Sequence, residues 1–298
     1  MPDIEMRGKI ANGEGFIAAL DQSGGSTPKA LKGYGIEQDA WASEEEMFEL
    51  IHAMRTRIIS SPAFSGDKVI GAILFERTMD GAIDGKPVPQ ALRDRGIVPF
   101  IKIDKGLEDE ADGIQLMKPM PELGALLERA RALGVFGTKE RSVINLADRA
   151  GIAAIVDQQI EIASQVLKTD LVPIIEPEVN IKSVERAAAD SILLDELIRA
   201  LDAMGGGDDR VMLKLSLPAT AGLFEPLVKH PRVLRVVALS GGYSRADACR
   251  ELARNHGVIA SFSRALLEDL RHQMSDAEFD VALGSAVDDI FDASTARC

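Results

Sequence analysis

The chain has 298 residues, a formal net charge of −13 at pH 7 and a sequence pI of about 4.9. So acidic a surface does not suit binding to nucleic-acid phosphates or to anionic lipid, and an anionic small molecule would need a local basic pocket. No uncharged apolar run approaches the roughly 18 residues typical of a membrane span, and the N-terminus lacks the apolar core of a signal peptide. We therefore expect a cytoplasmic protein without membrane or nucleic-acid partners.

The cysteines and histidines give little support to metal or redox chemistry. Two cysteines, Cys249 and Cys298, are too few for a disulfide framework or a thiolate metal site, and Cys249 lies in a helix-like stretch where we expect it to pack as a small apolar residue. The histidines have no His or Cys partner at ligand spacing; they are His52, His230, His256 and His272. Carboxylates could still bind Mg²⁺, but they are too numerous here to be diagnostic. The sequence predicts no metal and no cofactor.

Short apolar runs rich in Val, Ile, Leu and Phe recur along the chain and alternate with longer, charged segments. Two of these longer segments, at 123–134 and 147–168, have the apolar spacing of helices. Alternation of this kind predicts parallel strands joined by crossover helices. The eight runs lie at 15–21, 69–75, 98–104, 135–144, 171–178, 211–217, 233–240 and 257–263.

Eight strand-and-helix units in a chain of this length favour a single (β/α)₈ TIM barrel, of the α/β class, over an open doubly wound sheet, which is the alternative. No linker, repeat or low-complexity tract divides the chain, so we expect one domain over residues 1–298. The Gly- and Pro-containing stretches 80–96 and 105–121 are interpreted as long loops after strands. The segment 265–292 is interpreted as helices that cover the barrel.

Lys214 lies in the middle of the apolar run VMLKLSL at 211–217. In a strand that is buried on both faces, loss of solvent disfavours the ammonium group and lowers the lysine pKa, which leaves neutral amine able to attack a carbonyl carbon. The alternative is an edge-strand lysine whose charged end reaches solvent. Other polar residues that close further apolar runs favour the buried, reactive lysine. The sequence therefore predicts Schiff-base chemistry at Lys214.

Other polar residues also follow or interrupt the apolar runs. In a barrel, functional side chains gather at the carboxyl ends of the strands, so we expect these residues to form one site. A second lysine near Lys214 would lower its pKa further, and a buried glutamate would serve as acid and base, although a simple Lys–Glu ion pair is the alternative. The residues are Asp21, Lys102, Lys139, Glu176, Glu178, Ser240 and Arg264.

Two glycine-containing segments are candidates for phosphate binding. The segment LSGGYS places Ser240, Gly241 and Gly242 between the seventh strand and the next helix, where backbone N–H groups can approach an anion. Glycines serve ordinary turns more often, but the loops after strands 7 and 8 of a barrel frequently bind phosphate. The segment DQSGGSTPKAL, at 21–31, is either a turn or a second phosphate contact through Ser23, Ser26 or Lys29.

Taken together, these stretches resemble the class I (Schiff-base) fructose-1,6-bisphosphate aldolases, and more closely the shorter bacterial form. The resemblance spans nearly the whole chain and is specific because the motifs occur in the same order; they are LDQSGG, ILFERTMDGAIDGKPVPQALRDRGIVPFIKIDKG, GTKERSVI, PIIEPEV, VMLKLSLP, LSGGYS and ASFSRAL. It implies a metal-independent lyase of glycolysis and gluconeogenesis. The implied substrates are phosphorylated sugars: fructose 1,6-bisphosphate, dihydroxyacetone phosphate and glyceraldehyde 3-phosphate.

The resemblance also implies a role for each catalytic position. Lys214 would form the imine, and Glu176 would be the acid and base that dehydrates the carbinolamine. Asp21 would deprotonate the C4 hydroxyl so that the C3–C4 bond breaks. Lys139 would stabilise developing charge, and Glu178 would orient Lys139.

For the phosphates, the resemblance implies two groups of residues. Ser240, Gly241 and Arg264, with Ser261 beside them, would hold the phosphate that becomes dihydroxyacetone phosphate. The other phosphate would face Lys102, Arg141 and Ser23.

The chain departs from the animal enzymes of this family at three places. It ends in DASTARC without their C-terminal tyrosine, which assists proton exchange, and its only tyrosines are Tyr34 and Tyr243. Ala30 stands where they have an arginine at the distal phosphate, and Ser263 replaces a glycine before Arg264.

Two alternative functions stay open from the residues alone. One keeps the Lys214 imine but changes the substrate, as in transaldolase-like or deoxyribose-phosphate aldolases, which would need one phosphate subsite instead of two. The other is a non-catalytic barrel, which would not need Lys214, Glu176, Asp21 and Lys139 together. The sequence leaves the oligomeric state and the choice between bisphosphate and monophosphate ketoses open.

Overall fold

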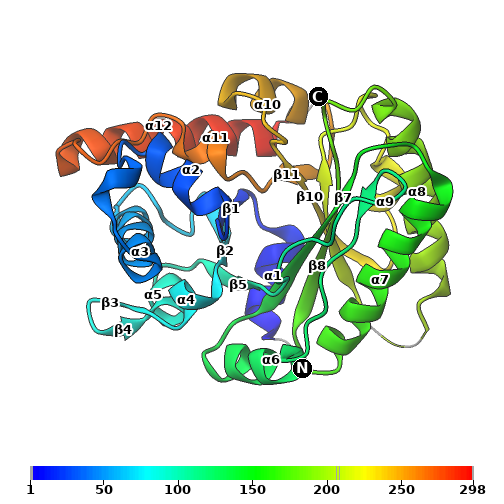
Figure 1. Ribbon diagram of the computed structural model, residues 1–298, viewed down its shortest axis with the longest axis horizontal. Coiled ribbons are helices and arrows are strands. Elements are labelled where there is room, and N and C mark those ends of the chain that lie inside the picture. Colours follow the sequence, from blue (N-terminus) through cyan, green and yellow to red (C-terminus); the bar gives the residue numbers. More distant parts are fainter. Residues whose placement is uncertain (1–2, 206, 208, 297–298) are drawn as a thin grey trace.

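The computed structural model of the protein describes residues 3–205, 207 and 209–296. Its main sheet contains eight parallel strands that follow one another in chain order around a barrel (Figure 1). This order confirms the (β/α)₈ prediction over the doubly wound alternative, in which the strand order reverses. The strands are β1 (Phe16–Leu20), β2 (Val69–Leu74), β5 (Val98–Lys102), β7 (Gly137–Ile144), β8 (Val172–Val179), β9 (Val211–Ser216), β10 (Val233–Leu239) and β11 (Val258–Ala260).

The first and last strands of the sheet lie side by side and nearly close the barrel. The backbone N–H of Ala19 in β1 donates to the carbonyl of Phe262, just after β11, at 3.0 Å. All eight strands coincide with the predicted apolar runs. The last strand is shorter than its run, but Ser261 still donates a backbone hydrogen bond to Ala238 in β10, at 2.7 Å.

Helices surround the barrel wall, with α7 and α8 on one side and α3 and α12 on the other (Figure 1). Several begin at a side-chain cap, such as Asp148 before α7 and Ser275 before α12. The helices are α1 (Ile4–Asn12), α2 (Ser26–Gly33), α3 (Glu44–Ser60), α4 (Glu76–Met79), α5 (Val88–Asp94), α6 (Leu123–Ala132), α7 (Arg149–Leu167), α8 (Arg186–Ala203), α9 (Glu225–Val228), α10 (Arg245–Leu252), α11 (Arg264–Leu267) and α12 (Asp276–Thr295), with a 3₁₀ turn at Gln38–Ala40.

The two long loops predicted at 80–96 and 105–121 carry small elements of their own. A two-stranded hairpin, β3 (Ala82–Ile83) with β4 (Lys86–Pro87), precedes α5, and β6 (Ile114–Gln115) pairs antiparallel with the end of β7. The predicted closing segment forms α11 and α12, which pack together beside β11. Cys249 lies half-buried in α10, as expected, and Cys298 lies outside the described residues.

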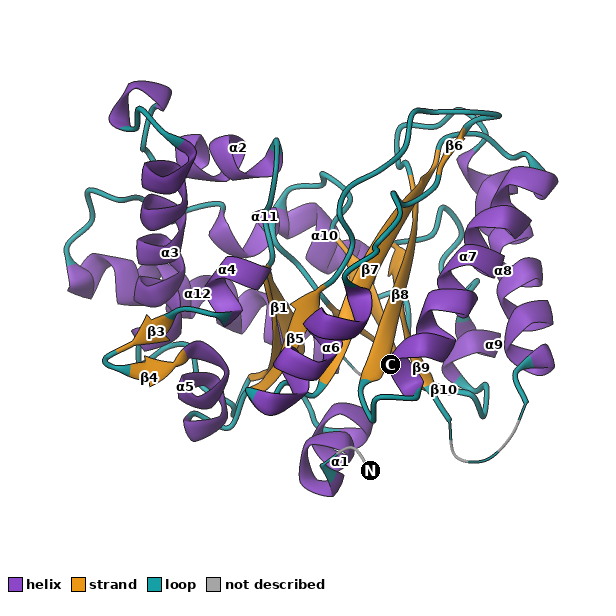
Figure 2. Cartoon of the chain, turned by 60° about the horizontal axis from the view of Figure 1, so that its bottom comes forward, coloured by secondary structure: helices purple, strands orange, loops and turns teal. Residues whose placement is uncertain are grey.

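The core divides into a layer inside the barrel and a larger layer between the strands and the helices. Inside, Ile17, Phe100, Ile174 and Met212 belong to one apolar cluster, and Ile10 of α1 packs against it. Figure 2 shows α1 beneath the strands, at the end opposite β6. Because helix α1 and apolar side chains close this end, the open end is the one where the strands finish.

Candidate active site

The inner face of each strand changes from apolar to charged along its length. Side chains two residues apart share a face of a strand, so Ile174, Glu176 and Glu178 of β8 all point into the barrel. In β9 the same rule places Met212 and then Lys214 inside. The apolar level packs with the inner core, and the charged level follows at the carboxyl ends of the strands.

Four of the predicted catalytic residues form one buried chain of ion pairs. Lys214 Nζ lies 3.2 Å from Glu176 Oε1, and the other oxygen of that carboxylate lies 2.9 Å from Lys139 Nζ. Lys139 Nζ also lies 2.8 Å from Asp21 Oδ2. Each of the four residues is at most 8% exposed. The prediction that Lys214 lies in a strand buried on both faces is confirmed, and Glu176 bridges the two lysines.

The electrostatics of this chain favour the charged forms of Asp21 and Lys139. Burial alone would raise the pKa of Asp21, but the ammonium groups of Lys139 and Lys214 outweigh it and hold the pKa well below its ordinary value. Burial would likewise lower the pKa of Lys139, and the carboxylates of Asp21 and Glu176 raise it instead. Asp21 is therefore an ionised carboxylate and Lys139 an ammonium group at neutral pH.

Two more cations lie beside this chain: Lys102 pairs in register with Lys139, and Arg141 lies two residues beyond Lys139 on β7. Lys102 of β5 donates to the carboxylate of Asp104 at 2.6 Å, and Arg141 of β7 donates to Glu178 Oε2 at 3.0 Å. Burial lowers the pKa of Lys102, although Asp104 opposes the shift. The cations predicted to face one phosphate thus each hold a carboxylate.

The structure does not bring Glu178, expected to orient Lys139, into direct contact with that lysine. Glu178 pairs in register with Val143, four residues beyond Lys139, which corresponds to about 13 Å along the strand. Arg141 lies two residues closer and takes the Glu178 carboxylate, whereas Lys139 contacts Asp21 and Glu176.

The glycine-containing loop after β10 lies against Arg264. Gly241 and Gly242 have φ values of 60° and 111°, which side chains rarely adopt, and a Cβ atom on Gly241 would stand 2.7 Å from a methyl group of Ile181. A Cβ atom on Gly242 would lie 3.6 Å from Arg264 Nη2. These two glycines, Ser240 and Arg264 therefore occupy one region at the ends of β10 and β11.

Ser261 belongs to the same two strands. It is 1% exposed, and its hydroxyl has no hydrogen-bond partner among the described residues. Its backbone pairing with β10 places it next to the loop that carries Ser240.

The loop after β1 is a tight turn that leads into α2. Ser26 Oγ accepts from the backbone N–H of Ser23 at 2.9 Å and donates to the Ser23 carbonyl at 2.7 Å. This places both predicted serines in one turn, directly after Asp21.

Known proteins support the same interpretation. The family described as fructose-bisphosphate aldolase class-I matches residues 5–201. The chain is 57% identical over 281 residues to the fructose-bisphosphate aldolase class 1 of Porphyromonas gingivalis, covering 94% of this chain and 95% of that protein.

The chain belongs to the class I fructose-bisphosphate aldolase family.

Solved structures agree with this fold. The fructose-bisphosphate aldolase of Plasmodium falciparum, solved with TRAP and a small-molecule inhibitor, superposes with a TM-score of 0.82 at 22% identity, over 98% of this chain and 93% of that one. A Corynebacterium glutamicum protein superposes with a TM-score of 0.55 at 15% identity, over 97% and 92% of the two chains. At these identities the likeness concerns the barrel fold alone.

Neither tyrosine of this family member stands at the charged chain. Tyr243 accepts a hydrogen bond from Arg186 Nη1 at 2.9 Å, and Tyr34 accepts one from Arg57 Nη1 at 3.2 Å while its ring packs on Phe279. Both tyrosines also pack with the outer core layer, between strands and helices. Each phenol is thus engaged outside the barrel.

The part of the chain that the structure describes holds neither a metal-ligand cluster nor a membrane-spanning helix. No group of three or more His, Cys, Asp or Glu side chains there is placed to hold a metal ion. Among the same residues, no helix is both long and apolar enough to cross a bilayer.

Three residues next to the site were absent from the predicted set. Asp104 accepts a hydrogen bond from Lys102 and is the last residue of the run at 98–104, so the rule that polar residues mark strand ends would have found it. Gln22, the residue after Asp21, and Arg55 of α3 are buried polar residues, and hydrogen bonds join them to each other. No local signal marks Arg55, because its position on α3 has the spacing of an ordinary core residue.

Proposed function

We propose that the protein reversibly cleaves fructose 1,6-bisphosphate into dihydroxyacetone phosphate and glyceraldehyde 3-phosphate through an imine on Lys214. The ion-pair chain Lys214–Glu176–Lys139–Asp21 carries this proposal. It supplies an amine, an acid and base, a fixed positive charge and an ionised carboxylate, each in direct contact with the next. Membership of the class I aldolase family supports it.

Imine formation would use Lys214 and Glu176. The neutral amine attacks the C2 carbonyl of the open-chain ketose and forms a carbinolamine, and Glu176 gives a proton to its hydroxyl so that water leaves. Glu176 is placed for this step because one of its oxygens already lies 3.2 Å from Lys214 Nζ. The other oxygen of the same carboxylate lies 2.9 Å from Lys139 Nζ.

Cleavage would use Asp21 as the base. Its carboxylate takes the proton of the C4 hydroxyl, the C3–C4 bond breaks, and the electron pair enters the protonated imine to give an enamine while glyceraldehyde 3-phosphate leaves. Protonation at C3 and addition of water at C2 then release dihydroxyacetone phosphate and regenerate Lys214. Lys139 would stabilise negative charge that develops during these steps.

The two phosphates would lie at opposite sides of this chain. Ser240, Gly241, Gly242 and Arg264, with Ser261 beside them, would hold the phosphate retained in dihydroxyacetone phosphate. Lys102, Arg141, Ser23 and Ser26 would face the other phosphate, with Glu178 holding Arg141 in place. These assignments follow the resemblance to the family.

The cellular setting completes the proposal. We infer a single domain over the whole chain, in the cytoplasm, with phosphorylated sugars as its partners and no nucleic acid. The net charge of −13 supports the last point.

The first experiment is to trap the imine. The protein is mixed with dihydroxyacetone phosphate, reduced with borohydride, digested and analysed by mass spectrometry. We expect a stable adduct on Lys214, no adduct in Lys214→Met, and slow adduct formation in Glu176→Gln. Full cleavage activity in a folded Lys214→Met protein, or an adduct on another lysine, would overturn the mechanism.

A further inference from the structure

Arg55 of α3 is a buried cation without a carboxylate partner. Its side chain is 1% exposed, and no ion pair joins it to an acidic residue in the described part of the chain. Burial lowers its pKa to about 10, opposed only by the charge of Asp21. Burying a cation without a direct counter-ion is costly, so its remaining contacts indicate what it holds.

The hydrogen bonds of Arg55 run to α4 and to the residue that follows Asp21 at the end of β1. One Nη atom donates to Thr78 Oγ1 at 2.7 Å, shortly after β2, and the other donates to the carbonyl and to the side-chain oxygen of Gln22, after β1, at 2.6 and 3.2 Å. Gln22 is the residue directly after Asp21. The guanidinium group therefore fixes the backbone next to the proposed base.

Gln22 also contacts the segment after the last strand of the barrel, on the other side of the junction between β1 and β11. Its side-chain NH₂ group donates to Ser263 Oγ at 2.6 Å, as well as to the carbonyl of Ala19 at 3.2 Å. Ser263 directly precedes Arg264, the proposed ligand of one phosphate. The path Arg55–Gln22–Ser263 thus joins the base and the phosphate ligand across β1 and β11, where the barrel closes.

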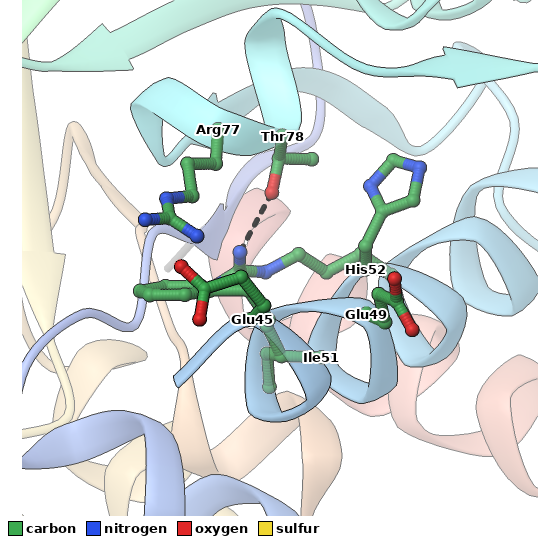
Figure 3. Close-up of a pocket in the computed structure, with 8 residues that line it drawn as sticks. Glu45, Glu49, Ile51, His52, Arg77 and Thr78 are labelled. Atoms are coloured by element: carbon green, nitrogen blue, oxygen red, sulfur yellow. Dashed lines mark hydrogen bonds between the residues drawn. The ribbon is translucent and has the colours of Figure 1, made fainter. Parts of the chain in front are cut away.

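Arg55 also borders a pocket. A pocket with a volume of about 260 Å³ lies between α3 and α4, and Arg55 lines it together with Glu45, His52 and Arg77. Figure 3 labels Glu45, His52, Arg77 and Thr78, and its dashed line ends at Thr78 Oγ1, which accepts the hydrogen bond from Arg55. The Nε atom of Arg55 has no hydrogen-bond partner among the described residues. The hydrogen bonds of Arg55 are therefore made by its two Nη atoms, to Thr78 and to Gln22.

We propose that Arg55 is a positioning residue for cleavage: through Gln22 and Ser263 it sets the place of Asp21 and Arg264 relative to one another. This inference rests on the proposed function, in which Asp21 takes the C4 hydroxyl proton and Arg264 binds a phosphate. A displacement of about 1 Å in a catalytic group can lower a rate roughly 100-fold, so buried support of this kind matters even without substrate contact.

Arg57 provides a matched control. It lies two residues further along α3 and also donates several hydrogen bonds, but these reach Tyr34, Met274 and Asp276, next to α12. Arg57→Met should therefore lower stability without changing the kinetic constants of the folded protein.

The experiment compares Arg55→Met, Gln22→Leu and Ser263→Ala with Arg57→Met. Cleavage of fructose 1,6-bisphosphate is measured as kcat and KM, imine trapping with dihydroxyacetone phosphate as a separate rate, and the folded fraction by circular dichroism. We expect kcat to fall about 10- to 100-fold in Arg55→Met and Gln22→Leu, by a smaller factor in Ser263→Ala, and trapping at Lys214 to change less than kcat. Arg55→Lys, which can still donate to Gln22, should recover part of kcat.

The outcomes separate the two proposals. Unchanged kcat in folded Gln22→Leu and Ser263→Ala would overturn the positioning role, as would losses in all variants that merely follow the folded fraction, as in Arg57→Met. Ser263→Ala keeps the test decisive if Arg55→Met does not fold, because it removes only one hydroxyl group. Failure of the proposed function would appear differently, as absence of any adduct on Lys214 in the unaltered protein.

Discussion

Lys139 and Glu140, on opposite faces of strand β7, are both buried but differ in their electrostatics. On the inner face, Lys139 contacts two carboxylates and Arg141 contacts a third. On the outer face, Glu140 is fully buried, and neither of its carboxyl oxygens has a hydrogen-bond partner among the described residues. Burial, with a smaller contribution from Asp104, raises the pKa of Glu140 well above its ordinary value.

The comparison teaches that partners, more than burial, decide the charge of a buried group. Asp21 and Glu140 are both buried. The pKa of Asp21 is nevertheless lowered, because the charges of two lysines outweigh the cost of removing its carboxylate from water. An ionised carboxylate inside the barrel can accept a proton from substrate, whereas a neutral carboxyl group outside can only affect folding. The same strand thus separates a catalytic face from a structural one.

The largest expected effect comes from removing the central cation of the inner face. In Lys139→Met, Asp21 loses its direct ion-pair partner and Glu176 loses one of two, so the pKa of Asp21 should rise. We expect kcat for cleavage to fall about 100- to 1,000-fold and the residual activity to depend on pH below neutrality. Steady-state kinetics from pH 5 to 8 measure both, and an unaltered pH profile would show that Lys139 does not control Asp21.

The charge of Asp21 should also appear in acid stability. Its pKa in the folded protein lies below the ordinary 3.8, so its ionised form stabilises the fold above about pH 4, and this contribution is lost as pH falls toward the folded value. Urea unfolding of the natural protein and Asp21→Asn should differ by about 2 to 3 kcal/mol near neutral pH, and the difference should shrink below pH 4. A constant difference down to pH 3 would contradict this.

Glu140 should show the opposite sign. Because its folded pKa is raised, the unfolded chain releases the Glu140 proton above about pH 4.5 while the folded protein keeps it, and the natural protein loses stability as pH rises. Glu140→Gln removes this proton, so its stability relative to the natural protein should increase by about 1 kcal/mol or more between pH 5 and 7. Chemical unfolding at both pH values tests this, and a pH-independent difference would argue that Glu140 is ionised in the fold.

The smallest expected effect concerns Thr138, also on the outer face of β7. Its hydroxyl group is buried and has no hydrogen-bond partner among the described residues. Thr138→Val keeps the shape of the side chain and removes the polar group, so thermal stability should stay within about 1 kcal/mol or improve, with kcat unchanged. A loss of several kcal/mol would reveal a hydrogen bond that depends on this hydroxyl.

Much of the site could be predicted because one local rule applies to every strand. Lys214, Glu176, Lys139 and Asp21 each lie in or directly after an apolar run, and a barrel brings such positions to one end. Which cation contacts which carboxylate could not be predicted in the same way. Glu178 contacts Arg141 instead of Lys139 because of the register of β7 against β8, which a list of strand ends does not contain.

The sequence by itself determined the strands, the barrel class and the chemical character of the site, because apolar periodicity and polar strand ends are properties of short segments. Only the tertiary structure decided that Arg55 reaches Gln22 and that Gln22 reaches Ser263, 241 residues away. That contact exists because the barrel closes β1 against β11, and closure depends on the packing of the whole chain. Long-range hydrogen bonds of this kind leave no periodic trace in the sequence.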